Sequence, residues 1–346
     1  MVNDFGAFLV FFHKSNSSFR LDRVTDKRLR TLKMKIAHHF ANNKILITGA
    51  SGFLGSNLCH RLSQMNAEVH AISRSLHPQE SHVRWWQGDM SDITTVRHIL
   101  KTVKPDIIFH LASHGVGSPE LAQVLPNLHN DLVATVNLLS VATELGCQRV
   151  VLTGSPEEPQ PNNKGEFVPV SPYAAAKLAS SAYGRMFHTI YQTPVVITKA
   201  FMTYGPRQRV HKLIPYVTTS LLQKQAPKLS SGQRQVDWIY VDDLIDGLLA
   251  AAHMPGIEGE TIELGTGKLT SIRTIVEMIS CIVNSGVEPL FGALPERPME
   301  REWAADTQVA YEKLKWQATT PLFKGLTSTV NWYRQQIEDV TEKIPV

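Results

Sequence analysis

Cysteine is scarce in this sequence, with three among 346 residues. Cys59, Cys147 and Cys281 lie far apart, and no Cys-x-x-Cys pair is present. A disulfide framework and a cysteine-based zinc site are therefore excluded, and a reducing, cytoplasmic setting fits best. His110 and His114 are spaced like helical metal ligands, but they fall on a strand end and a loop. We predict no metal site and interpret His110 as a buried strand residue.

Long apolar runs are also missing. The longest early run, Phe5–Phe12, is far short of the roughly 20 residues needed to cross a bilayer. Basic residues follow it, whereas a secretory signal has them first. Charged residues make up 19% and hydrophobic residues 43% of the chain, a balance typical of a globular protein. We predict no membrane partner.

Positive charge is concentrated at one end. Residues 1–43 have a net charge of +5, and the other 303 residues have a net charge of −1. A nucleic-acid surface needs basic residues clustered on the folded body, so we predict no nucleic-acid partner. We expect residues 1–43 to be a disordered N-terminal extension or the result of a start codon assigned too early, upstream of Met34. A transit peptide is the alternative.

From residue 44 onward, short apolar runs alternate with helical patterns. Helices are predicted over residues 56–64, 130–145 and 173–189. Buried strands are predicted over residues 44–48, 68–72, 83–87, 107–111, 149–153 and 194–198. Strands separated by helices form parallel sheets through right-handed crossovers. The pattern therefore predicts an α/β fold with a doubly wound parallel sheet of the Rossmann type.

The alternation of strands and helices ends after residues 204–206, where prolines separate shorter elements. We predict an NAD(P)-binding Rossmann domain over residues 44–200 plus about 235–260. Residues 201–234 and 261–346 are expected to form a smaller C-terminal substrate-binding domain.

A glycine-rich turn, Thr48-Gly-Ala-Ser-Gly-Phe-Leu-Gly55, lies directly between a predicted strand and a predicted helix. Gly49 permits the tight turn, Gly52 lets the backbone approach a pyrophosphate, and Gly55 lets the helix pack against the strand. The helix N-terminus then faces the phosphates. A plain strand–turn–helix is the alternative, but the complete context favours a dinucleotide site.

The second strand distinguishes the two forms of the cofactor. NAD sites usually have an acid at its end, which holds the ribose 2′-hydroxyl. Here Ser73 ends the strand and Arg74 follows. Since a guanidinium suits a 2′-phosphate, the sequence favours NADP(H), with NAD(H) as the alternative. Arg74 could instead be a solvated loop residue. Asp89, after the third strand, places a carboxylate near the adenine.

Tyr173 and Lys177 are four residues apart on a predicted helix and therefore share a face. A nearby ammonium favours the phenolate and lowers the pKa of a tyrosine, as an oxidised nicotinamide also would. Such a tyrosine can move a proton while a cofactor moves a hydride. Ser155 follows the fifth strand at the edge where ligands bind, and its hydroxyl could hold the same substrate oxygen.

Together these segments resemble the extended short-chain dehydrogenase/reductase family, in its NAD(P)-dependent sugar epimerase/dehydratase group. The landmarks run from about residue 44 nearly to the end of the chain. They are TGASGFLG (48–55), GD (88–89), FHLAS (109–113), Asn130, TGSPEE (153–158), YAAAK (173–177), YGPRQ (204–208) and DWIYVDD (237–243). The resemblance implies a nucleotide-sugar substrate, and we expect a homodimer.

The resemblance also assigns roles to individual residues. It makes Ser155, Tyr173 and Lys177 catalytic, with Glu157 in the position of the glutamate of 4,6-dehydratases. It implies substrate contacts from Lys212, Arg234 and Arg297. It implies that the cofactor is lined by Gly49, Ser51, Gly52, Phe53, Leu54, Gly55, Arg74, Asp89, Met90, Leu111, Ala112, Ser113, Tyr173 and Lys177.

The sequence departs from the family pattern in several places. Lys199 and Met202 replace an Arg and an Asn before the Tyr-Gly-Pro segment, which puts a contact with the substrate diphosphate in doubt. Val236 replaces a further arginine, for which Arg234 is the substitute. Pro156 stands where one dehydratase branch has an aspartic acid.

Three chemistries fit these residues: 4-ketoreduction, 4-epimerisation and 4,6-dehydration. The Gly-Ser-x-Glu-Glu stretch at residues 154–158 and the predicted NADPH preference favour a 4-keto sugar reductase slightly. The other two activities are the alternatives. A reductase of a non-sugar carbonyl and a non-catalytic NAD(P)-binding regulatory protein on the same fold are further hypotheses, since fold alone does not prove activity.

Overall fold

The computed structural model describes residues 38–41, 43–79, 82–296 and 302–342. Its centre is a seven-stranded sheet in the order β3-β2-β1-β4-β5-β6-β9, in which every neighbouring pair is parallel. The strands are β1 (Lys44–Thr48), β2 (Glu68–Ser73), β3 (Val83–Gln87), β4 (Ile107–His110), β5 (Arg149–Gly154), β6 (Val195–Ala200) and β9 (Thr261–Leu264). The predicted doubly wound Rossmann sheet is confirmed.

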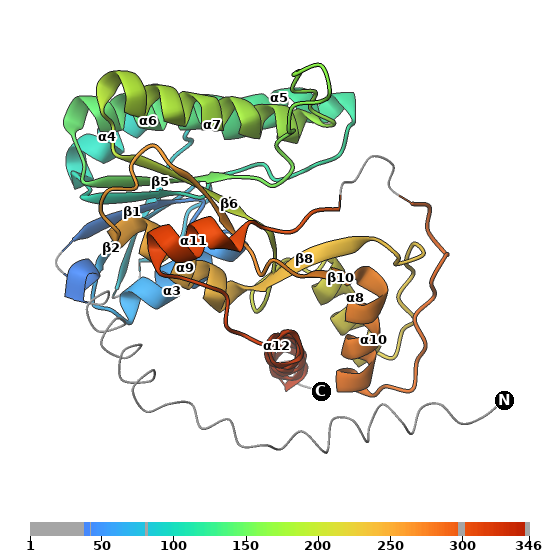
Figure 1. Ribbon diagram of the computed structural model, residues 1–346. Helices are drawn as coiled ribbons and strands as arrows, with labels where there is room; N and C mark the ends of the chain where they lie inside the picture. The colour runs from blue at the N-terminus through green and yellow to red at the C-terminus, as the bar shows by residue number, and fades with distance from the viewer. Residues whose placement is uncertain (1–37, 42, 80–81, 297–301, 343–346) are drawn as a thin grey trace.

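Helices cover both faces of this sheet (Figure 1). One layer consists of α4 (Ile93–Val103), α5 (Val124–Asn127), α6 (Ala134–Leu145) and α7 (Pro172–Tyr191), and the other of α3 (Phe53–Ser63), α9 (Val241–His253) and α11 (Thr307–Leu314). Successive strand residues face opposite layers. Ile45 and Ile47 belong to the core cluster on the α3/α9 side, and Leu46 belongs to the cluster on the α4/α6 side. Burial on both faces explains why the central strand β1 is nearly continuously apolar.

Side-chain caps fix where two of the helices begin. Asp92 accepts hydrogen bonds from the backbone of Thr94 and Thr95 at the start of α4. Ser171 accepts one from Ala174 at the start of α7, where Pro172 takes the first helical position. Proline is favoured there because the first N–H of a helix has no intrahelical partner. The cap of α7 lies two residues before Tyr173 and so fixes the helical turn that carries it.

The helix predicted from residue 130 differs in its first turn. A short 3₁₀ turn (Leu121–Gln123) and α5 lead into a π-helical segment, Leu128–Val133, and α6 begins only at Ala134. A π turn has one extra residue and a wider backbone ring, and such turns are frequent at functional sites. The hydrophobic spacing alone did not reveal it.

A smaller part of the molecule lies to one side of the large sheet (Figure 1). It holds the three-stranded sheet β10-β8-β7, in which β7 is parallel and β10 antiparallel to β8. Its elements are β7 (Met202–Tyr204), α8 (Leu213–Leu222), β8 (Gln235–Tyr240), β10 (Leu269–Ser271), α10 (Ile272–Val283) and α12 (Leu322–Glu342). Ile214, Trp238, Ile275 and Leu326 are buried in a core of its own.

The chain divides between the two parts differently from our prediction. We assigned about 235–260 to the Rossmann domain, but β8 belongs to the small sheet. We assigned residues 261–346 to the small domain, but β9 is the seventh strand of the large sheet. Ala310 and Leu314 of α11 are buried in the large core. β9 has only four residues, two of them half-exposed, so its sequence lacks the apolar run of a buried strand.

The predicted boundary at residue 43 lies slightly too late. Residues 38–41 are helical, and the Phe40 side chain is 0% exposed and packs near Phe109 of β4. The rest of the predicted extension, residues 1–37, lies outside the described residues. None of the described helices is long and apolar enough to cross a membrane.

Candidate active site

The glycine turn has the geometry that a dinucleotide requires. Gly49 has a φ of +67°, and a Cβ there would lie 2.7 Å from the backbone of Leu111 and Ala112. A Cβ on Gly55 would collide with the backbone of Gly49 and Ala50, so α3 can approach β1 only with glycine there. A Cβ on Gly52 would meet only the Gly49 carbonyl, at 3.1 Å. Space above Gly52 is therefore kept open, as a pyrophosphate needs.

The first turn of α3 is suited to an anion. It contains no acidic residue, and Gly52 caps the helix without a side-chain hydrogen bond. The helix dipole and its first N–H groups are therefore available to phosphate oxygens. The side chains of Phe53 and Leu54 pack against the large core. Only their backbone is therefore left to face this turn. The residues present thus fit the phosphates of a nicotinamide dinucleotide.

Three of the predicted cofactor residues lie in this turn or follow β2 and β3. The Ser51 hydroxyl is 3.1 Å from that of Ser73 at the end of β2. Arg74 is exposed, and its Nη1 donates to Asn130 Oδ1 at 3.0 Å. Asp89 is exposed and accepts hydrogen bonds from the backbone and hydroxyl of Ser91. The Arg74 guanidinium is thus held over the strand edge rather than buried in an ion pair.

The end of β4 forms the next wall of the site. The Ala112 backbone N–H donates to Thr48 Oγ1 at 3.1 Å, which fixes this segment against β1. Leu111 and Ala112 are half-buried, and Ser113 is exposed. Met90 follows β3 and is buried in the core beneath this edge, so its side chain supports the site rather than lining it.

The structure brings the three predicted catalytic residues together. The Tyr173 side chain is hydrogen-bonded to that of Ser155, which is buried just beyond β5. The Lys177 ammonium lies 5.8 Å from the centre of the Tyr173 ring and donates to the Thr153 carbonyl at 3.0 Å. The ends of β5 and α7 thus place a hydroxyl, a phenol and an ammonium within one small volume.

The acidity of Tyr173 differs from our expectation. We predicted a pKa lowered by Lys177. Burial raises the pKa of Tyr173 well above its usual range, the hydrogen bond with Ser155 acts in the opposite direction, and the negative charge of Glu157 raises it further. The phenol is therefore protonated in this structure. A positively charged ring bound beside it would favour the phenolate.

Two adjacent glutamates after Ser155 have different environments. Glu157 is exposed, its backbone N–H donates to Ser155 Oγ at 3.1 Å, and its carboxylate lies against Gly117. Glu158 is buried and accepts a hydrogen bond from the Ser155 backbone N–H at 2.8 Å. Its other oxygen lies 3.4 Å from Lys199 Nζ. Glu157 therefore faces the open site, while Glu158 and Lys199 form a buried pair that holds the Ser155 backbone.

The predicted substrate residues that the structure describes are less buried than Ser155 and Lys177. Lys212 is exposed at the N-cap of α8, and Arg234 is half-buried just before β8. Arg297 lies outside the described residues. Met202 is 40% exposed, so the position at which we expected a family asparagine is accessible. Lys199, at the place of the family arginine, turns instead to Glu158.

Sequence reasoning missed Asp131, which is buried with its carboxylate 3.4 Å from Lys177 Nζ. It lies in the π-helical segment, and the only sequence signal was an acid near the start of a predicted helix. The prediction for His110 is confirmed. The buried imidazole lies between the hydroxyls of Thr48 and Thr135, at 2.8 and 3.1 Å, and burial lowers its pKa to about 3.

Comparison with known proteins gives the class. Residues 45–265 match the NAD dependent epimerase/dehydratase family. Since this match covers well over half of the chain, the protein belongs to that family and is one of its enzymes. The resemblance that we inferred from the motifs is confirmed.

Individual relatives agree with this class. The chain is 29% identical over 321 residues to a dTDP-glucose 4,6-dehydratase of Mycolicibacterium smegmatis, covering 84% of this chain and 93% of the relative. It is also 29% identical over 321 residues to a UDP-glucose 4-epimerase of the same organism, covering 85% and 99%. The solved UDP-glucuronic acid 4-epimerase of Bacillus cereus, in complex with UDP-glucuronic acid and NAD, is 25% identical with a TM-score of 0.74, covering 85% and 99%.

Proposed function

We propose that this protein transfers a hydride between a nicotinamide cofactor and C4 of a nucleotide-linked sugar. The observation that carries the proposal is the Ser155–Tyr173 hydrogen bond with Lys177 beside it, at the same sheet edge as the glycine turn. A bound nicotinamide would accept or return the hydride. Tyr173 would move the hydroxyl proton, and Ser155 would hold the same oxygen. Lys177 would favour the phenolate during that step.

The cofactor would lie along the turn from Gly49 to Gly55, with its adenosine toward Arg74 and Asp89. The sequence favours NADP(H) because Arg74 replaces the usual acid. The exposed guanidinium supports that preference, since it is free of carboxylate contacts among the described residues. NAD(H) is the alternative, and the NAD bound to the Bacillus cereus relative favours it.

The three activities that fit the site differ in the last chemical step of the reaction. We propose 4-keto sugar reduction, on the Gly-Ser-x-Glu-Glu stretch and on Pro156, which has no acidic proton to give. The names of the two Mycolicibacterium smegmatis relatives support the alternatives equally well: one is a 4,6-dehydratase and the other a 4-epimerase. A reductase consumes reduced cofactor at each turnover, whereas an epimerase or a dehydratase recycles it.

The experiment follows from that difference. Purified protein would be mixed with NADP(H) or NAD(H) and a panel of UDP- and dTDP-sugars and their 4-keto-6-deoxy derivatives. Reduced-nicotinamide absorbance and product mass would be followed. Steady loss of NADPH with a gain of two hydrogens in a 4-keto sugar supports reduction. A product of unchanged mass, or one lighter by water, without net cofactor use supports an alternative.

The small C-terminal part would bind the nucleotide. Lys212 and Arg234 lie on its segments, and we propose that they meet the diphosphate, since arginine and lysine are favoured for phosphate contacts. We also propose Arg297 for this role on the sequence alone. Replacing each by glutamine should raise the KM for the sugar nucleotide and leave cofactor affinity unchanged.

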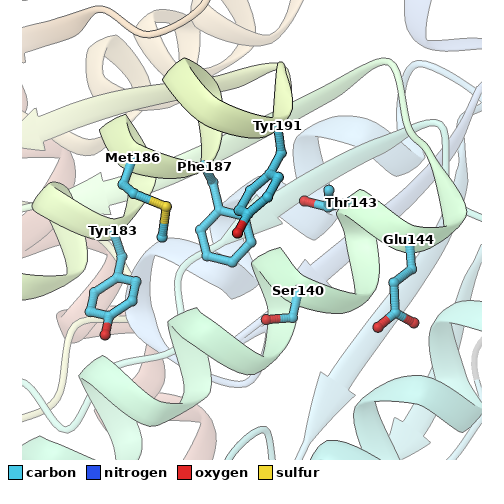
Figure 2. Close-up of a pocket in the computed structure, with 7 residues that line it drawn as sticks. All are labelled: Ser140, Thr143, Glu144, Tyr183, Met186, Phe187 and Tyr191. Atoms are coloured by element: carbon cyan, nitrogen blue, oxygen red, sulfur yellow. The ribbon is translucent and has the colours of Figure 1, made fainter.

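We further propose a homodimer that packs through the α6/α7 face. Figure 2 shows the side chains of Tyr183, Met186, Phe187 and Tyr191 from α7 and those of Ser140, Thr143 and Glu144 from α6. These residues line a groove of about 300 Å³. Tyr183, Ile190 and Tyr191 are exposed large side chains along one helix, and such clusters mark interaction sites. Light scattering of wild type and of Tyr191→Asp would test this.

The cytoplasmic setting also stays a proposal. The free thiols of the three cysteines support it.

A further inference from the structure

A buried carboxylate lies directly beneath the backbone of the catalytic serine. Glu158 is 3% exposed, and its Oε1 accepts a hydrogen bond from the Ser155 backbone N–H at 2.8 Å. The same oxygen accepts a hydrogen bond from the Ser181 hydroxyl at 3.0 Å. Ser181 lies one helical turn after Lys177, on the same face of α7. One oxygen of Glu158 therefore joins the end of β5 to the helix that carries Tyr173 and Lys177.

A missing side chain and a buried cation make room for this carboxylate. A Cβ on Gly154 would lie 2.6 Å from Glu158 Oε1, so glycine leaves the carboxylate its place. Gly154 lies opposite Lys199 in the register of β5 and β6. Lys199 is 8% exposed, and its Nζ lies 3.4 Å from Glu158 Oε2. Because an isolated charge is costly to bury, each of these two ions makes the burial of the other tolerable.

This link lies beside the catalytic groups. The Ser155 hydroxyl is hydrogen-bonded to Tyr173, so its position depends on how the end of β5 lies relative to α7. Lys177 makes one connection between these elements, through its hydrogen bond to the Thr153 carbonyl. Glu158 makes a second connection, at the backbone of Ser155 itself. Groups that act on one substrate oxygen have to be held in a fixed geometry, and small displacements lower the rate.

We propose that Glu158 is a positioning residue that holds Ser155 at hydrogen-bonding distance from Tyr173, with Lys199 as its buried counter-ion. The proposal rests on the proposed function, because that function gives Ser155 its role on the substrate oxygen. It separates the two neighbouring glutamates, since Glu157 faces the open site and Glu158 acts through the serine. It also assigns Lys199 to the serine rather than to the substrate.

The test compares two double variants, Glu158→Gln/Lys199→Met and Glu158→Met/Lys199→Met. Both remove the buried ion pair, so neither leaves an unpaired charge in the core, and any effect of that charge on Tyr173 is the same in both. Glutamine keeps an oxygen that can accept from the Ser155 N–H, whereas methionine has a similar length and only a weak acceptor. We expect kcat of the methionine variant to be lower than that of the glutamine variant by about 10- to 100-fold, with equal cofactor affinity in both. Equal kcat values in the two folded variants would overturn the proposal.

Ser181→Ala tests the same link from α7 and leaves the ion pair in place. It removes one hydrogen bond to Glu158 and fits the space of serine, so it serves as the test if the methionine variant does not fold. We expect a lower kcat with an unchanged Kd for the cofactor. Ser220→Ala, the same change at a buried position of α8, is the control and should leave kcat at the wild-type value. A Ser181→Ala variant as active as this control would contradict the proposal.

Hydrogen exchange of the Ser155 backbone amide keeps this result separate from the proposed function, because it needs no sugar. In the methionine variant this N–H has no strong acceptor, so it should exchange about fivefold faster or more than in the glutamine variant. Exchange in β1, on the far side of β4, should be the same in both. A wild type that binds NADP(H) or NAD(H) but converts no nucleotide sugar would refute the proposed function. In that case, selectively faster exchange at Ser155 would still support the placement of Glu158. Equal exchange at Ser155, or faster exchange throughout β1 as well, would refute it.

Discussion

The large sheet and the small C-terminal part differ in how deeply they bury the residues assigned to the site. At the sheet edge, Ser155, Tyr173 and Lys177 are joined through hydrogen bonds and close contacts to β5, α7 and the π turn. In the small part, Lys212 is exposed and Arg234 half-buried, each on a segment next to a loop. In a parallel sheet the carboxyl ends of the strands meet at one edge, so the side chains that follow these strands have fixed relative positions. Loops that bind the variable part of a substrate are not held in place by such a sheet.

The largest effect is expected on the sheet side, from Tyr173→Phe. The ring still packs, but the proton route is lost, so turnover should fall by about 10²–10⁴-fold while cofactor affinity stays nearly unchanged. Tyr311→Phe, at an exposed position on α11, is the control. Steady-state rates and fluorescence titration with NADP(H) measure both. Near-normal turnover in Tyr173→Phe would remove this residue from the mechanism.

The same contrast decides what the sequence could predict. The central strands of the large sheet were found because burial on both faces makes them nearly continuously apolar. The glycine turn was found because each glycine has a steric reason. β9 was missed since it has four residues and a mixed pattern. The residues of β8 were assigned to the Rossmann domain because pairing partners are not visible in a local pattern. Asp131 was missed because only tertiary contact brings it to Lys177.

The next prediction concerns the first described residues of the chain, just before β1. Phe40 is fully buried, so Phe40→Ala should lower the free energy of unfolding by about 3–5 kcal/mol. Deletion of residues 1–33 should leave folding and activity unchanged, because it retains Phe40. Urea unfolding compares the two variants. A deletion that costs as much as Phe40→Ala would mean that the sheet part depends on the extension as well.

Acid should weaken the sheet side through His110. An unfolded histidine titrates near its ordinary pKa of 6.5, whereas burial lowers the pKa of His110 to about 3. Between these values the unfolded chain binds a proton that the folded chain refuses. Stability should therefore fall with decreasing pH by about 1.4 kcal/mol per pH unit for this group. Urea unfolding from pH 7 to pH 4 should show a shallower slope in His110→Gln, and equal slopes would contradict the assignment.

Arg74→Asp tests whether the residue that follows β2 contacts the ribose of the cofactor. A carboxylate repels a 2′-phosphate and accepts from a 2′-hydroxyl, so NADP(H) affinity should fall by about 10- to 100-fold and NAD(H) affinity should rise. Arg84→Asp, on β3, makes the same charge change at an exposed position and should alter neither affinity. An unchanged NADP(H) affinity in Arg74→Asp would show that Arg74 does not face the ribose.

The smallest effect is expected from Glu157→Gln. A 4-ketoreductase breaks no carbon–hydrogen bond on the sugar, so the loss should be roughly the 1 kcal/mol of one hydrogen bond. A 4,6-dehydratase needs a base for the C5 proton and would lose about 10²–10⁴-fold, with reduced cofactor accumulating. Rates of product formation distinguish the two. Exchange of solvent deuterium into C5 by the wild type would contradict the reductase proposal.

Hydride transfer at C4 is the central claim, and isotope transfer tests it most directly. NADP²H or NAD²H, labelled on the transferable position of the nicotinamide, would be incubated with the protein and 4-keto-6-deoxy derivatives of UDP- and dTDP-sugars. Deuterium should appear at C4 of the sugar with the wild type, and about 10²–10⁴-fold more slowly with Tyr173→Phe. Cofactor binding without deuterium transfer to any of these sugars, or transfer at the wild-type rate in Tyr173→Phe, would contradict the account.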